Sequence, residues 1–102
     1  MKLSVKKIDG RIYFLFRGEL DDKAAKGVRE LMDEILDRET YSSVVLDLSQ
    51  LTFMDSTGIG LIIGRYKRLK PYKKDIFIMN PSRQVDKILV TTGLYQIIRK
   101  IG

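Results

Sequence analysis

The sequence predicts one small α/β domain over residues 1–102, with a mixed, mostly parallel sheet of four to five strands flanked by three to four helices. Three observations support this fold class. A chain of 102 residues fits one domain built around one core. Strand and helix patterns alternate along most of the chain, which is typical of parallel strands joined by right-handed crossovers. A hairpin signal near the N-terminus adds an antiparallel pair, so the sheet must be mixed.

The first two strands are expected to form a hairpin. The runs LSVKKID and RIYFLFRGEL are rich in β-branched and aromatic residues and meet at Asp9-Gly10, a strong signal for a two-residue turn. Ile12, Phe14 and Phe16 alternate with side chains that are only partly polar. One face of the second strand should therefore be covered.

An amphipathic helix is expected from Lys23 to Glu39, after an N-cap signal at Asp21 and Asp22. Gly27 lies inside it at a cost of about 1 kcal/mol relative to Ala, and simple tolerance is the favoured explanation. Apolar residues recur at spacings of three and four and are expected to face the core: Ala24, Val28, Leu31, Met32, Ile35 and Leu36.

The second half of the chain continues the alternation. SSVVLDLSQL, at 42–51, is dense in Val and Leu, which indicates a central strand buried on both faces. A helical pattern follows from near Ser56 to around Pro71, and DIFIM, at 75–79, reads as another short buried strand. The last helix is expected to begin at 80–82, and the tail YQIIRKI offers a possible last strand. The residues expected to face inward from this last helix are Val85, Ile88, Leu89 and Leu94.

Composition excludes several classes of function. Cysteine and histidine are both absent, which removes disulfides, thiolate chemistry, the usual zinc sites and any histidine-based triad. No catalytic residue, metal site or cofactor is therefore predicted. No apolar run approaches the roughly 20 residues that span a bilayer, so the sequence predicts a cytoplasmic protein without a membrane segment.

A cluster of basic residues lies in RYKRLKPYKK, at 65–74, within a chain of net charge +6. Three interpretations stay open: a solvated helix end whose cations complement the helix dipole, a docking site for an acidic protein surface, and a nucleic-acid site. The first is favoured, and no direct nucleic-acid binding is predicted.

The segment FMDSTGIG, at 53–60, lies between a predicted strand and a predicted helix, where ligand and partner sites of such sheets occur. It does not match a phosphate-binding loop, because the P-loop pattern G-x-x-x-x-G-K-S/T is absent and its glycines are spaced one residue too far apart for G-x-G-x-x-G. It does not match a nucleophile elbow either, since Met54 occupies the place of the first glycine of G-x-S-x-G.

Two structural interpretations of this segment stay open. Asp55 or Ser56 could cap the helix, with Gly58 and Gly60 letting the helix pack tightly on the sheet. The glycines at 58, 60 and 64 would also leave one flank of the helix nearly bare, which suits a partner that must approach a hydroxyl closely.

A serine modified by another enzyme is a further possibility for this segment. A phosphate on Ser56 would meet free N–H groups at the helix start, although Asp55 would oppose it. The expected switch is local, because about two negative charges would appear on a recognition surface.

The chain resembles the STAS domain, and in particular the sporulation type of anti-sigma-factor antagonist. The resemblance rests on VVLDLSQLTFMDSTGIGLIIGRYKRLK at 44–70, FRGELD at 16–21 and VDKILVTTGLYQIIR at 85–99, so it covers almost the whole chain. It implies a regulatory protein that is not itself an enzyme.

The resemblance also implies partners and site residues. An anti-sigma factor with serine-kinase activity, of the histidine-kinase-like ATPase fold, would bind the unphosphorylated chain and release its sigma factor. The kinase would then phosphorylate Ser56, and a metal-dependent serine phosphatase would reverse the modification. The implied partner-binding residues are Asp21, Asp55, Ser56, Thr57, Gly58, Gly60 and Gly64.

Three departures from the family pattern affect this transfer. Thr57 replaces a second serine and leaves a rival acceptor, Asp22 adds a carboxylate after GELD, and the chain is unusually basic. The alternative function is a constitutive STAS scaffold in another signalling or transport complex.

Overall fold

The computed structural model describes residues 1–102 and confirms the predicted fold class. The five strands lie in the order β1-β2-β3-β4-β5, with β1 antiparallel to β2 and all other pairs parallel. The elements are β1 (Lys2–Ile8), β2 (Arg11–Leu20), α1 (Asp22–Arg38), β3 (Ser43–Met54), α2 (Ser56–Leu69), β4 (Asp75–Met79), α3 (Arg83–Thr91) and β5 (Arg99–Ile101), with short 3₁₀ turns at Lys70–Tyr72 and Leu94–Gln96. None of the helices is long and apolar enough to cross a membrane.

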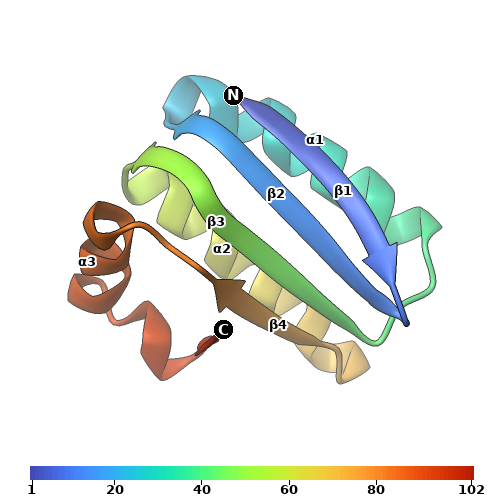
Figure 1. The fold of residues 1–102 in the computed structure, drawn as a ribbon. Helices are drawn as coiled ribbons and strands as arrows, with labels where there is room; N and C mark the ends of the chain where they lie inside the picture. The colour runs from blue at the N-terminus through green and yellow to red at the C-terminus, as the bar shows by residue number, and fades with distance from the viewer.

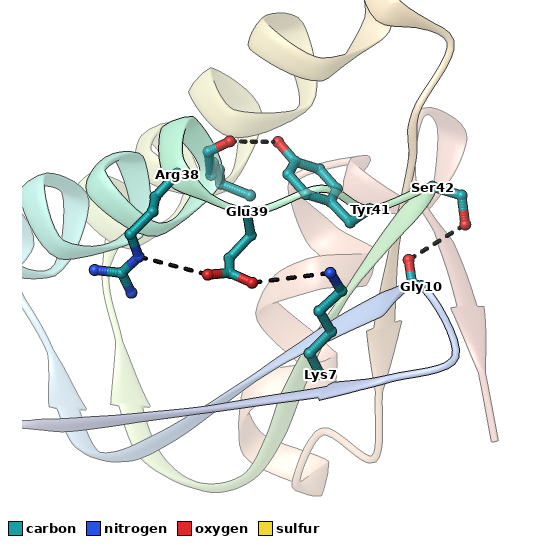
Figure 2. A network of polar contacts seen from close by, with 7 residues as sticks. Lys7, Gly10, Arg38, Glu39, Tyr41 and Ser42 are labelled. Atoms are coloured by element: carbon teal, nitrogen blue, oxygen red, sulfur yellow. Dashed lines mark hydrogen bonds and ion pairs between the residues drawn. The ribbon is translucent and has the colours of Figure 1, made fainter.

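The predicted two-residue turn joins β1 to β2. Asp9 and Gly10 have φ angles of 49° and 77°, the left-handed conformations that a type I′ hairpin turn requires. The turn is also tied to the loop before β3, because Ser42 donates to the Gly10 carbonyl from its backbone N–H (2.8 Å) and its hydroxyl (3.3 Å). Figure 2 shows the hydrogen bond from the Ser42 hydroxyl and also the ion pair between Lys7 and Glu39 (3.8 Å).

One face of the sheet carries the core. Figure 1 shows α1 and α2 side by side behind the sheet, and the inward side chains of β2, β3 and β4 contact them. These inward positions alternate along each strand, as at Ile12, Phe14 and Phe16. β4 pairs only with the first half of β3, and α3 packs against β3.

Two expectations about element boundaries and core membership are wrong. β3 continues to Met54 instead of ending near 51, because the long C-terminal part of β2 pairs with it as far as Leu20 and Met54. Leu31 is 40% exposed. Val28 and Met32 are buried in the apolar stripe of α1 that faces the sheet, and Leu31 lies to one side of this stripe.

The other helical expectations are met in part. Ala25, not Ala24, is buried in the first turn of α1, and Ile88 is half-buried. Val85 and Leu89 are buried as predicted, and Leu94 is buried too, but it lies in the 3₁₀ turn after α3 and not in the helix. A side chain added at Gly27 would meet nothing within 4 Å, which confirms simple tolerance there.

Candidate functional site

Two helix N-termini lie next to each other at the carboxyl edge of the sheet. Leu20 and Met54 are register partners at the ends of the parallel strands β2 and β3. An aspartate follows each strand and caps the next helix. Asp21 accepts from the N–H of Ala24 (3.0 Å), and Oδ1 of Asp55 accepts from those of Thr57 (2.9 Å) and Gly58 (3.3 Å). The structure therefore brings the predicted residues Asp21 and Asp55 to one edge.

Ser56 and Thr57 are the first two residues of α2, and both are exposed. Asp55 is the N-cap, so the Ser56 hydroxyl is not needed for capping. The expectation that a phosphate on Ser56 would meet free N–H groups is wrong for Thr57 and Gly58, because Asp55 already accepts from both. A phosphate at this position would lie beside the Asp55 carboxylate, which already accepts from these two N–H groups.

The three glycines of α2 have different surroundings. Gly58 is buried, and a Cβ atom there would lie 2.4 Å from Cγ of Met54 and 3.2 Å from the Leu20 carbonyl oxygen. The expectation of tight packing is thus confirmed for Gly58. It is wrong for Gly60, where an added Cβ would meet nothing within 4 Å. Gly64 is equally open, so Gly60 and Gly64 leave the helix flank bare as predicted.

Phe53 adds an apolar side chain to this edge that the sequence did not single out. It is 38% exposed although it belongs to β3, and its register partner in β2 is Glu19. The pairing of β2 with β3 shifts between Gly18 and Glu19, which breaks the alternation of inward and outward side chains. In the sequence, the one sign of an exposed apolar side chain here is that the aromatic Phe53 directly precedes Met54 at the end of a strand.

The basic cluster 65–74 divides into two parts. Arg65 is only 9% exposed, and its Nε lies 3.1 Å from Oδ1 of Asp33 in α1. Arg68 reaches the same oxygen at 3.0 Å and also pairs with Asp37. Burial lowers the pKa of the Arg65 guanidinium, and the carboxylate of Asp33 opposes that shift. These two arginines therefore join α1 to α2 and are not part of a solvated cluster.

The lysines of the cluster remain outside this network. Lys70 lies 5.7 Å from the ring centroid of Tyr66, and Lys74 lies 3.9 Å from that of Tyr41. They follow the C-terminus of α2, about 20 Å from Ser56 along a helix of 14 residues. We use the name Ser56 edge for the residues implied from the sequence: Asp21, Asp55, Ser56, Thr57, Gly58, Gly60 and Gly64. The cluster and the Ser56 edge are therefore separate surfaces.

The Ser56 edge offers a hydroxyl and carboxylates but no group of metal ligands. No three Asp, Glu, His or Cys side chains in the chain lie close enough to hold a metal ion. The edge presents an exposed hydroxyl in the first turn of α2, beside the capped start of α1 and next to the open flank at Gly60 and Gly64.

Comparison with known protein families and sequences gives consistent matches. The model of the STAS-domain family matches residues 2–102. The chain is 37% identical to the anti-sigma F factor antagonist of Paenibacillus polymyxa, over 79% of this chain and 69% of that protein. It is 32% identical to the anti-sigma F factor antagonist of Lysinibacillus sphaericus, over 76% of this chain and 66% of that protein. It is 30% identical to the anti-sigma-B factor antagonist of Listeria monocytogenes serovar 1/2a, over 79% and 70%.

Solved structures share the fold. The anti-sigma factor antagonist SpoIIAA in its unphosphorylated form superposes with a TM-score of 0.84 at 24% identity, over 99% of this chain and 89% of that chain. An anti-sigma factor antagonist from Mycobacterium paratuberculosis gives 0.88 at 19% identity, over 99% and 86%. The arrangement of strands and helices seen here is therefore shared with proteins whose sequences have diverged widely.

Proposed function

Because the chain belongs to the STAS-domain family and, within it, to the anti-sigma-factor antagonists, we propose that its unphosphorylated form binds an anti-sigma factor and thereby releases a sigma factor. The anti-sigma factor is proposed to be a serine kinase of the histidine-kinase-like ATPase fold. It phosphorylates Ser56 and so ends the interaction.

The observation that carries this proposal is the position of Ser56. It is exposed at the first turn of α2, its hydroxyl is free of the capping role that Asp55 fills, and Gly60 leaves the next turn without a side chain. A kinase must bring the γ-phosphate of ATP close to the acceptor oxygen, and a helix flank without side chains permits that approach. The Ser56 oxygen would attack the γ-phosphorus, ADP would leave, and the hydroxyl proton would pass to a base of the kinase.

Phosphorylation would act locally. The phosphate brings about two negative charges and three oxygen acceptors into a surface that a partner covers closely. Asp55 prevents it from using the N–H groups of Thr57 and Gly58, so the phosphate projects toward the partner. Steric overlap and the cost of desolvating the phosphate then favour dissociation.

The proposal includes the reverse reaction and a location. A metal-dependent serine phosphatase would hydrolyse the phosphate on Ser56, and the chain itself would be a substrate of both enzymes without catalysing either step. A cytoplasmic location follows from these partners, because sigma factors act on RNA polymerase. The partner surface is proposed to be the Ser56 edge, with Phe53 added; within it the buried Gly58 acts through the packing of α2 against Met54 and Leu20.

Phosphorylation mapping tests the proposal. The cognate kinase and ATP should add one phosphate to the purified chain, and mass spectrometry of its peptides should place it on Ser56. Ser56→Ala should remove the label, whereas the matched variant Thr57→Ala should keep it. Labelling of the Ser56→Ala variant at the wild-type level would refute the assignment of Ser56, and absence of labelling in the wild type would favour a scaffold that is not switched.

A further inference from the structure

The face of the sheet opposite to α1 and α2 has no helix packed on it. Figure 1 shows this face toward the viewer, with α1 and α2 behind the sheet. Side chains alternate along strands, so the register partners Tyr13 and Val45, and Val45 and Phe77, share this second face. None of its side chains belongs to the core cluster or packs against it. We call this surface the open face; its apolar members are Ile8, Tyr13, Leu15, Val45, Phe77, Met79 and Ile101.

An uncovered face is unusual for parallel strands. Sheets made of parallel strands are normally covered on both faces, because their strands are apolar on both sides. Here Val45 and Phe77 are buried between their neighbours, whereas Ile8 is 45% exposed and Tyr13, Leu15 and Met79 are half-buried. A hollow of about 510 Å³ lies on this face, lined by residues of β1 and β2 together with Asp47 of β3 and Met79 of β4. A contiguous apolar surface of this kind marks an interaction site.

The charges around the open face are mainly positive. The guanidinium carbons of Arg11 and Arg99 lie 5.2 and 5.3 Å from the centroid of the Phe77 ring. Neither arginine takes part in an ion pair, and the same holds for Lys6 and Arg17 on the same face. The carboxylates on this face are Asp47, which accepts from the N–H of Ser49, and Asp75.

We propose that the open face binds an acidic amphipathic helix of a partner protein. The apolar side of such a helix would cover Tyr13, Leu15 and Met79, and its carboxylates would pair with Arg11 and Arg99. A second copy of this chain is disfavoured, because its open face would bring the same unpaired cations against these. The site goes beyond the proposed function and uses none of the residues of the Ser56 edge.

The probe for this site is a fluorescent synthetic helix of leucine and glutamate at heptad spacing. Its anisotropy on titration with the whole chain is compared with that of a scrambled peptide of the same composition and of a leucine–lysine helix. We expect the leucine–glutamate helix to bind at least tenfold more tightly than either. Amide chemical-shift changes should concentrate at Tyr13, Leu15 and Phe77 and be absent at Ser56.

Matched variants separate this site from net charge and from folding. Leu15→Glu should weaken binding at least tenfold, and Leu31→Glu, an exposed position on α1, should not. Arg99→Glu should weaken binding, whereas Arg83→Glu, the same charge change on α3, should leave it within twofold. Thermal unfolding checks that each variant is folded. Each variant should still be phosphorylated on Ser56 like the wild type, so failure here leaves the proposed function unaffected.

Three results would overturn the proposal. The first is equal affinity for the scrambled peptide, or shifts on another surface. The second is a dimer in sedimentation with protected amides at Tyr13 and Leu15, which would identify a second copy as the occupant. The third is tighter binding to vesicles of anionic phospholipid than to the helix, which would identify a membrane.

Discussion

Gly58 shows that a glycine of the segment 53–60 has a packing role. A methyl group there would overlap Met54 and press on the Leu20 carbonyl, so Gly58→Ala should reduce the free energy of unfolding by about 1–3 kcal/mol. Urea denaturation measures the change.

Gly60→Ala is the matched control on the same helix. It fills open space and gains helix propensity, so it should be neutral or stabilise the chain by up to about 1 kcal/mol. If both variants were equally destabilised, close packing at Gly58 would not explain the result.

Asp33 determines whether Arg65 can be buried. Asp33→Ala would leave the buried guanidinium without its carboxylate and should cost about 1–3 kcal/mol. This cost is lower than the roughly 3–5 kcal/mol for breaking a fully buried ion pair, because the Asp33 side chain is 27% exposed to solvent. Urea denaturation at neutral pH gives the difference.

Asp37→Ala is the control, because the Asp37 side chain is 68% exposed and its one ion pair is with Arg68. This variant should cost less than about 1 kcal/mol. Equal effects of the two variants would show that burial of Arg65 does not depend on Asp33.

These residues also show where sequence patterns reach their limit. The turn at Asp9-Gly10 and the cap at Asp55 depend on local backbone chemistry, which neighbouring residues specify. The exposure of Leu31 and Phe53 and the burial of Arg65 depend on which element packs nearby. Helical spacing alone cannot show that Arg65 and Arg68 of the basic cluster pair with α1, since the carboxylates concerned lie in another helix.

The link between α3 and β5 is polar and depends on pH. Asp86 of α3 accepts hydrogen bonds from the Tyr95 hydroxyl and from Lys100 Nζ, the latter at 3.2 Å. The hydrogen bond from Tyr95 is the main cause that lowers the pKa of Asp86; desolvation opposes this shift, and Lys100 adds to the lowering. A lowered pKa in the folded state stabilises the fold above the ordinary carboxyl pKa, and this contribution is lost as the pH falls through the lowered value.

Asp86→Asn should therefore be less stable than the wild type at neutral pH, and the difference should shrink below about pH 4. Denaturant titrations at several pH values measure it. Asp75→Asn, at an exposed carboxylate without an ion pair, should change the free energy of unfolding by no more than about 0.5 kcal/mol at neutral pH. A difference for Asp86→Asn that persisted undiminished well below pH 4 would contradict the role of the carboxylate charge.

The order of the elements was predictable from the sequence, but the position of α3 was not. Alternating strand and helix patterns specify parallel pairing and the direction of the crossovers. Because β4 is short and β3 is long, α3 packs against β3. The open face also depends on how the helices are distributed: α1 and α2 cover one side of the sheet and α3 packs against β3, so no helix covers the second side.

Across the molecule, the charged side chains are distributed unevenly, which the net charge alone does not show. The total of +6 combines carboxylates at the Ser56 edge with cations at the end of α2 and around the open face. The candidate site could be predicted as a segment, because Asp21, Asp55 and Ser56 follow strands that pair in parallel. The choice of Ser56 over Thr57 as the acceptor stays a prediction, because both residues are exposed. The partner contacts of the site stay a prediction as well.

Displacement of a labelled sigma factor tests the proposed function most directly. The complex of the sigma factor with its cognate anti-sigma kinase is titrated with the chain, and release is followed by fluorescence anisotropy. The unphosphorylated chain and the Ser56→Ala variant should both release the sigma factor, and the chain phosphorylated on Ser56 should not. Release by both forms to the same extent, or by neither, would contradict a switch at Ser56.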